Sequence, residues 1–237
     1  IDIKNSITDP YENIFVKTYN LNNPVNLIAI CDISSSVFVA KKNDLVLREL
    51  TKIIARSAIE QGDRFSMLCY NDYIKSQNIL EPSNNLQYIN QWIDSIKLDS
   101  VKSSSDASKE INKYLPDEKS LIFWITDFHY SIDEIEKILN QLSNHHVIPV
   151  FISSENEIKK LPKYGFRKFV DSELNIESEV FLRPSVKEKI LKEYRDVKET
   201  IFHIFSSKQM KQIIIDEKID IEKIQKYFMS TYIWEIL

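Results

Sequence analysis

The chain has 237 residues, of which 43% are hydrophobic and 28% are charged, so it is long enough to bury a full core and too apolar to be disordered. A net charge of −4 without a basic block argues against nucleic-acid binding, and no run approaches the roughly 20 apolar residues of a membrane span. There is no amino-terminal signal pattern, and Cys31 and Cys69 lie in apolar runs typical of buried thiols. We therefore expect a cytoplasmic protein with a lead-in at 1–24 and one domain at 25–237.

The first predicted strand spans residues 25–31, an almost unbroken apolar run that is typical of a strand buried on both faces of a parallel sheet. It ends at Asp32, and Ser34 and Ser36 follow at alternate positions. In an open α/β sheet, ligands bind at the loops that leave the carboxyl ends of central strands. Three hard oxygen atoms turned toward one point suit a small divalent cation such as Mg²⁺.

Strands and helices are predicted to alternate along the rest of the chain, because apolar residues recur either in short unbroken runs or at helical spacing. This alternation implies a Rossmann-like, doubly wound α/β fold, with a mostly parallel sheet and helices on both faces. The predicted elements, in chain order, are a strand at 25–31, a helix from 43 or 44 to 62, strands at 64–70 and 73–80, a helix from 84 or 85, a short helix at 107–114, a strand at 120–126, a helix from 132, a strand at 147–152, irregular pieces with a hairpin over 161–182, a long helix from 184, a strand at 213–215, and a terminal helix that reaches 232 or beyond.

Local signals set several boundaries of these elements. Asn43 or Asp44, Asn84 or Asn85, and Asp220 are candidate helix caps, and Gly62 suits a left-handed position at a helix end. Capping boxes are predicted for two further helices, formed by Ser131 with Glu134 and by Ser185 with Glu188, the latter next to Pro184. The turn at 71–72 predicts a hairpin that makes the second of its strands an antiparallel edge.

Two later stretches add to the candidate site. The apolar strand at 120–126 also breaks on an aspartate, Asp127, and a polar loop at 103–106 reads Ser-Ser-Ser-Asp. Mg²⁺ takes about six oxygen ligands and usually keeps several waters. If hydroxyl groups bind the ion directly and two aspartates act through water, one coordination position of the ion stays open. That position suits a carboxylate from another protein.

The combination of Asp-x-Ser-x-Ser after a buried strand, a hydroxyl in a second loop and an aspartate after a later strand resembles the metal-ion-dependent adhesion site of von Willebrand factor A (vWA) domains. The resemblance is closer to the bacterial vWA proteins associated with MoxR-type AAA+ ATPases, a family of unknown function. It covers residues 24–232 and is carried by Gln-Gly-Asp-Arg-Phe at 61–65, by the apolar run that ends in Thr-Asp-Phe at 126–128, and by Lys-Leu-Pro-Lys-Tyr-Gly at 160–165. One departure is Ser105, which stands where the family loop has threonine.

The resemblance implies a non-enzymatic binding module that serves as an adaptor. The implied partners are a MoxR-type AAA+ ATPase or another protein that supplies a carboxylate, with no nucleic acid. The implied ion is Mg²⁺ or Mn²⁺, since both accept the same oxygen shell. The implied metal ligands are Asp32, Ser34, Ser36, Ser105 and Asp127.

Other interpretations compete with the metal site. Serine at position 105 lacks the methyl group that restricts threonine, which leaves a metal-free interaction scaffold as the main alternative. A hydrolase triad of Ser34, His129 and Asp127 is a distant third, because neighbouring histidines and aspartates rarely meet the required geometry. The pair at 145–146, His-His, is expected to be a surface turn rather than a metal site.

Overall fold

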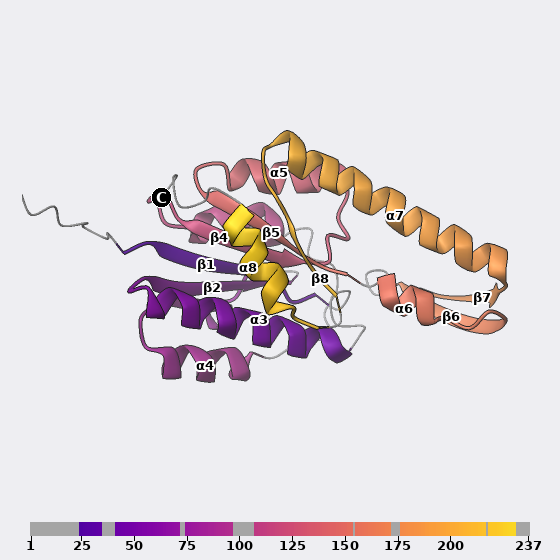
Figure 1. The fold of residues 1–237 in the computed structure, drawn as a ribbon, viewed down its shortest axis with the longest axis horizontal. Helices are drawn as coiled ribbons and strands as arrows, with labels where there is room; N and C mark the ends of the chain where they lie inside the picture. Colours follow the sequence, from indigo (N-terminus) through magenta and orange to yellow (C-terminus); the bar gives the residue numbers. More distant parts are fainter. Residues whose placement is uncertain are drawn as a thin grey trace, which may run out of the picture.

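A six-stranded sheet in the order β3-β2-β1-β4-β5-β8 forms the centre of the molecule, with helices on both faces (Figure 1). The structure is a computed structural model and describes residues 24–34, 41–71, 74–96, 107–153, 155–171, 176–216 and 218–230. Neighbouring strands pair in parallel, except that β3 runs antiparallel to β2 at one edge. The strands are β1 (Asn26–Asp32), β2 (Arg64–Tyr70), β3 (Ile79–Ser83), β4 (Leu121–Thr126), β5 (His146–Ile152) and β8 (Ile213–Ile215).

Two apolar layers cover the sheet, one on each face. Leu27, Ala29 and Cys31 pack toward one face and Ile28 and Ile30 toward the other, as the alternation of side chains along a strand requires. The first layer is completed by α3 (Lys41–Glu60), α4 (Leu86–Ser95) and α8 (Ile221–Ser230), and the second by a 3-10 helix (Ala107–Tyr114), α5 (Ile132–Gln141) and the inner end of α7 (Pro184–Ser207). The predicted doubly wound α/β fold is confirmed.

Several local predictions are confirmed by hydrogen bonds. The side chain of Asn85 accepts from the backbone of Tyr88 at 3.1 Å, and Ser131 and Glu134 form the predicted capping box. Asp220 caps α8, because its carboxylate accepts from the backbone of Lys223 at 3.2 Å. The two cysteines are buried and free, as predicted.

Gly62 lies beyond the end of α3 with a φ of +83°, the left-handed conformation that glycine adopts without strain. The predicted start of this helix was wrong. It begins at Lys41, so Asn43 and Asp44 lie inside its first turn and do not cap it. The prediction of a tight hairpin at 71–72 was also wrong, because the path from β2 to β3 includes a 3-10 turn at Ser76–Asn78. The antiparallel edge that it predicted is nevertheless present.

An arm extends from the sheet between β5 and β8. It confirms the hairpin predicted within residues 161–182, where the predicted irregular pieces are instead two regular strands. It consists of α6 (Glu155–Lys160), the antiparallel strands β6 (Gly165–Asp171) and β7 (Ile176–Leu182), and the outer part of α7 (Figure 1). The predicted capping box of α7 was wrong: Arg183 is the N-cap without a side-chain bond. Proline at position 184 occupies the first helical turn, which places Ser185 inside the helix.

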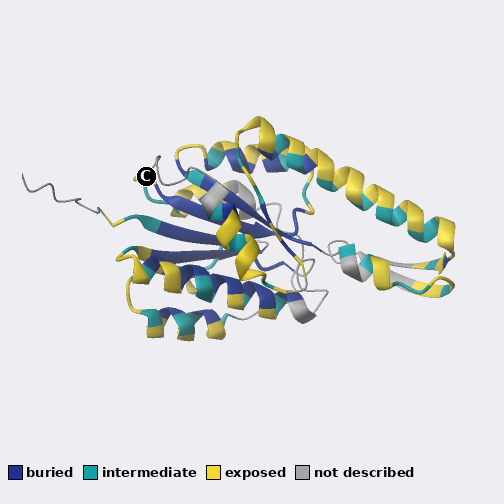
Figure 2. Cartoon of the chain, in the orientation of Figure 1, coloured by how far each residue is buried: buried dark blue, intermediate teal, exposed yellow. Residues whose placement is uncertain are grey.

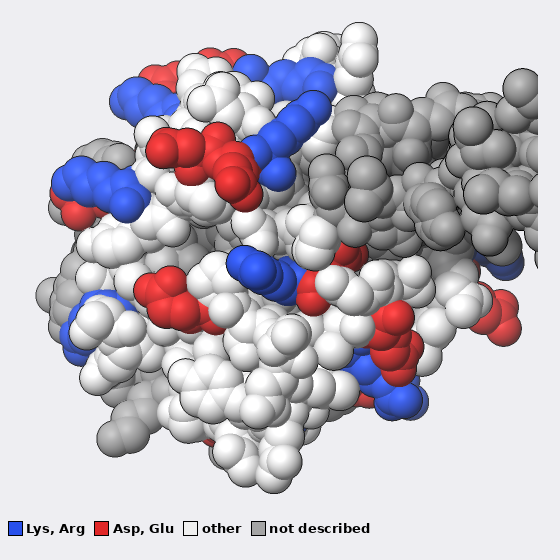
Figure 3. Space-filling view, turned by 90° about the vertical axis from the view of Figure 1, so that its left-hand side faces the viewer, with Lys and Arg blue, Asp and Glu red and all other residues white. Residues whose placement is uncertain are grey.

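Burial follows this division (Figure 2). The central strands are dark blue beyond their first residues, whereas exposed positions dominate the outer turns of α7. Charged side chains of both signs are interspersed on the face near the amino ends of the central strands (Figure 3). None of the helices described here is long and apolar enough to cross a bilayer.

Candidate functional site

The carboxyl ends of β1 and β4 meet at the point where the strand order of the sheet reverses. β1 is followed on one side by β2 and on the other by β4, which is the arrangement that opens a crevice in doubly wound sheets. Asp32 is the last residue of β1, and Asp127 directly follows β4. Their exposed fractions are only 1% and 5%, so two carboxyl groups are buried in the same region.

The Asp32 carboxylate is held by donors from its own loop and from the end of β4. Its Oδ1 accepts from the backbone N–H of Ser34 at 2.8 Å, which is an Asx-turn geometry. Its Oδ2 accepts from the hydroxyl of Thr126 at 3.1 Å and also from the hydroxyl of Tyr130. Both oxygens therefore have partners within the protein, and their orientation is set before any ligand arrives.

Behind Asp32 lies a chain of aromatic donors. The indole N–H of Trp124 donates to the hydroxyl of Tyr70 at 3.0 Å, and the hydroxyls of Tyr70 and Tyr130 are 3.0 Å apart. A neutral tyrosine has one proton to donate, and that of Tyr130 goes to Asp32. The proton between the two tyrosines must therefore come from Tyr70. Each group donates to the next, and the chain ends on the carboxylate.

Burial and the neighbouring acid dominate the electrostatics of the site. Burial and, next, the charge of Asp127 raise the pKa of Asp32 to about 6, even though the bonds from Tyr130 and Ser34 act in the opposite direction. Burial, together with the charge of Asp32, also raises the pKa of Tyr70 well above its ordinary value. The site thus concentrates negative charge in a place that is shielded from water, where a cation would offset it.

Asp127 is positioned by an unusual backbone turn. Phe128 has a φ of +56°, which a bulky side chain rarely adopts, and its buried ring packs between Trp124 at 4.7 Å and Phe205 at 5.1 Å, measured between ring centroids. The Asp127 carboxylate accepts from the backbone of His129 at 3.2 Å and lies 3.0 Å from Nδ1 of the same residue. Packing of the Phe128 ring therefore offsets the cost of the positive φ, and this backbone turn sets the position of the neighbouring Asp127.

The structure brings together three of the five predicted metal ligands, namely Asp32, Ser34 and Asp127. Ser36 and Ser105 lie outside the described residues, so their roles stay predictions. Within the described ranges, no three His, Cys, Asp or Glu side chains cluster as metal ligands, which leaves the two aspartates and nearby hydroxyls as the donor set.

Two histidine predictions have different outcomes. The Asp127–His129 contact of the hydrolase triad, the distant third interpretation, is present, and the side chain of Ser34 hydrogen-bonds Asp32. The surface turn expected at 145–146 was wrong for His145, which is buried and accepts from the backbone of Ser120 at 3.3 Å. Burial lowers the pKa of His145, so its imidazole favours the neutral form.

Sequence reasoning missed the residues that support the site from behind, Tyr130, Tyr70 and Thr126. Tyr130 lies only three positions after Asp127, and a hydroxyl-bearing aromatic residue so close to a predicted ligand was the available signal. Tyr70 ends β2, and its proximity to Tyr130 follows only from the strand order.

Comparison with solved structures gives distant likenesses. Proximal thread matrix protein 1 from the mussel byssus is 17% identical, with 59% of this chain and 41% of that chain covered and a TM-score of 0.44. A form of the same mussel protein with a zinc-occupied MIDAS motif is 15% identical, with 72% and 47% covered and a TM-score of 0.45. The hypothetical protein BatB from Bacteroides thetaiotaomicron is 13% identical, with 87% and 97% covered and a TM-score of 0.48.

The match thus spans less than half of the mussel protein. No curated protein matches this chain. A family model described as "Protein of unknown function DUF58" matches residues 3–200, which is most of the chain.

Proposed function

This chain belongs to the DUF58 family of proteins of unknown function, and we propose that it is a non-enzymatic protein-binding module with a divalent-cation site at the carboxyl ends of β1 and β4. The observation that carries the proposal is the pair of buried carboxyl groups of Asp32 and Asp127 at the switch point of the sheet. Two acids that share a buried crevice repel each other unless a proton or a cation intervenes.

The chemistry of the donor set fits Mg²⁺ or Mn²⁺, which prefer carboxylate, hydroxyl and water oxygens. Asp32 already accepts three hydrogen bonds, which suits a role through bound water better than direct ligation. Direct ligation falls to the hydroxyls of Ser34, Ser36 and Ser105 in this proposal, with Asp127 also acting through water. A bound ion would supply a Lewis-acidic position for one further oxygen ligand.

A carboxylate from another protein is the proposed occupant of that position. Such a ligand completes an oxygen shell and balances the charge of the ion, while the surrounding loops provide the rest of the interface. By resemblance to the MoxR-associated vWA proteins, the proposed partner is a MoxR-type AAA+ ATPase, with this chain as its adaptor. The proposed module binds its partner through the ion and catalyses no reaction, so we propose that it is non-enzymatic.

A metal-free interaction scaffold is the second candidate, and one observation favours it. The described contacts already supply donors to both carboxylates: Asp32 has Tyr130 and Thr126, and Asp127 has His129. A site stabilised in this way needs no ion to remain folded. The two candidates differ in whether partner binding depends on a divalent cation.

The test is a calorimetric titration of chelator-stripped protein with Mg²⁺ and with Mn²⁺. Asp127→Asn is the informative variant, because it removes one negative charge while its only described partner is His129, a largely exposed residue. Asp117→Asn is the matched control, since it removes the same charge from an exposed loop residue. We expect saturable binding that is lost in Asp127→Asn and retained in Asp117→Asn.

A pull-down with a purified MoxR-type ATPase, in Mg²⁺ and in EDTA, tests the partner. Complex formation that requires Mg²⁺ and an intact Asp127 supports the adaptor role. Equal complex formation in EDTA assigns the domain to the metal-free alternative. Cation binding that is identical in wild type and Asp127→Asn would contradict the proposed site itself.

A further inference from the structure

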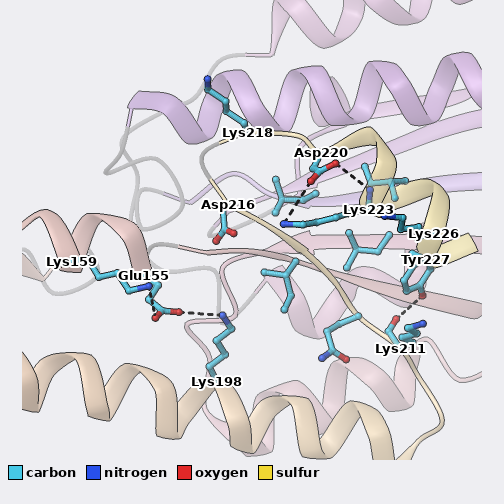
Figure 4. Close-up of a pocket in the computed structure, with 15 residues that line it drawn as sticks. Glu155, Lys159, Lys198, Lys211, Asp216, Lys218, Asp220, Lys223, Lys226 and Tyr227 are labelled. Carbon is cyan, nitrogen blue, oxygen red and sulfur yellow. Dashed lines mark hydrogen bonds and ion pairs between the residues drawn. The ribbon is translucent and has the colours of Figure 1, made fainter. Parts of the chain in front are cut away.

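A cleft of about 900 Å³ lies along β8, the edge strand of the sheet opposite β3, and shares no residue with the site at Asp32 and Asp127 (Figure 4). One wall comes from α6 and α7, and the other from α8 and the segment before it. The strand itself crosses the floor. The cleft therefore lies between the arm and the body of the domain.

The cleft concentrates positive charge in a protein whose net charge is −4. Among the residues that the structure describes, its lining includes six lysines and three acids, Glu155, Asp216 and Asp220. Lys218 and Lys226 make no ion pair with any residue that the structure describes. The lysines stand on both walls of the cleft: Lys159, Lys198, Lys211, Lys218, Lys223 and Lys226.

The acid nearest the arm is already shared among several cations. Glu155 lies 3.0 Å from Lys159, 2.9 Å from Arg195 and 3.7 Å from Lys198. Hydrogen bonds from Lys159 and Arg195 hold the pKa of Glu155 at about 2, so it stays ionised and still leaves this wall with surplus positive charge. An anionic ligand would relieve that surplus.

The floor of the cleft offers a backbone edge. The amide of Ser153 in the chain after β5 donates to the carbonyl of Ile215 at 2.8 Å, so the backbone groups of Ile215 face β5. Backbone groups alternate in direction along a strand, so those of Ile214 face the open edge. On the faces of the sheet, the side chains of Ile213 and Ile215 are buried, whereas that of Ile214 is 37% exposed. A sheet edge of this kind is a template for another strand.

We propose that this cleft binds an extended acidic peptide segment of a partner protein, which adds as a strand along β8 and places its carboxylates against the lysines of the wall that includes Lys218 and Lys226. Main-chain hydrogen bonds to Ile214 provide the alignment, and the charge of the walls selects the sequence. A peptide with acidic residues at alternate positions turns them toward one side, as strand geometry requires.

The experiment is fluorescence anisotropy of the full chain with a labelled short peptide of alternating glutamate and valine. We expect saturable binding of this peptide and none of its lysine–valine counterpart. Lys218→Glu combined with Lys226→Glu should weaken binding about tenfold, because two unpaired cations become anions. The matched control reverses two exposed lysines away from the cleft, Lys119→Glu with Lys137→Glu, and should bind like wild type.

Strand addition is tested separately on the unmodified protein, with a peptide of the same sequence that is N-methylated at alternate residues. N-methylation removes backbone donors and keeps the charge, so binding should be lost. Unchanged binding of the methylated peptide, or equal loss in both double variants, would overturn the proposal. Tighter binding of a single-stranded oligothymidylate, lost in Lys218→Glu with Lys226→Glu, would also overturn it and assign the cleft to nucleic acid.

Discussion

The site at the carboxyl ends of β1 and β4 and the arm beyond β5 are stabilised in opposite ways. At the site, buried aromatic rings surround a chain of neutral donors that ends on Asp32. In the arm, α6 and α7 are joined by charged groups, with Glu155 bound to Arg195 and the Lys187 ammonium donating to the carbonyl of Leu161 at 2.6 Å. The rings of Phe166 and Phe181 contact each other on the hairpin in a tilted arrangement with centroids 4.9 Å apart, yet Phe166 is 65% exposed.

The two regions therefore tolerate different substitutions. A buried polar group must keep its partner, because water cannot replace a lost hydrogen bond there. Charged contacts at a surface are exchangeable with water and are screened by salt. We therefore expect substitutions at the site to reduce the free energy of unfolding far more than comparable substitutions in the arm.

The largest effect is expected for Trp124→Ala. Trp124 is fully buried, packs on Phe128 and donates to Tyr70, so its removal leaves a large cavity and a Tyr70 hydroxyl without its donor. The free energy of unfolding should fall by about 3–5 kcal/mol, measured by urea denaturation. Phe166→Ala in the arm is the control and should change it by less than about 1 kcal/mol. Equal losses would remove the contrast between the two regions.

An intermediate effect is expected for Tyr70→Phe. The ring is kept, but the indole N–H of Trp124 loses its acceptor and Tyr130 loses its donor. An unsatisfied buried donor costs about 1–3 kcal/mol, which should appear as a lower midpoint in the same urea denaturation with an unchanged slope. Tyr88→Phe, at an exposed position on α4, provides the comparison and should be neutral. A neutral result for Tyr70→Phe would mean that the donor chain adds no stability.

The smallest effect is expected for Glu155→Gln, which sharpens the comparison from the side of the arm. The pKa of Glu155 is lowered to about 2 by its bonds to Lys159 and Arg195, so its stabilising contribution is present above its ordinary pKa and is lost as pH falls from about 4.5 toward 2. At pH 7 the variant should lose about 1 kcal/mol, and less at high salt.

Protection of α6 from proteolysis, compared between the wild type and Glu155→Gln at pH 7 and pH 3, provides the measurement for this last change. The difference between the two proteins should shrink at the lower pH. Glu136→Gln on α5 removes an exposed charge elsewhere and should follow wild type at both values. A difference that grows at low pH would contradict the assigned sign.

Local pattern was sufficient for the elements whose signals lie within a few residues. The apolar runs at 25–31 and 120–126 predicted β1 and β4, and Asn85 and Ser131 marked helix starts because a cap bonds to a backbone group only two or three positions away. The same reasoning misplaced the cap of α7, because Pro184 shifts the first turn by one or two residues. The hairpin of β6 and β7 was predicted, but the regular strands on its two sides were not.

The sequence by itself determined the doubly wound α/β fold and the placement of Asp32 and Asp127 at two strand ends, since both follow from short-range patterns of apolar and polar residues. Only the tertiary structure decided which distant residues support them. The Trp124–Tyr70–Tyr130 chain joins two strands and a loop, and the lysine-lined cleft gathers residues from 159 to 226. Such juxtapositions depend on strand order and helix packing, which local sequence patterns do not encode.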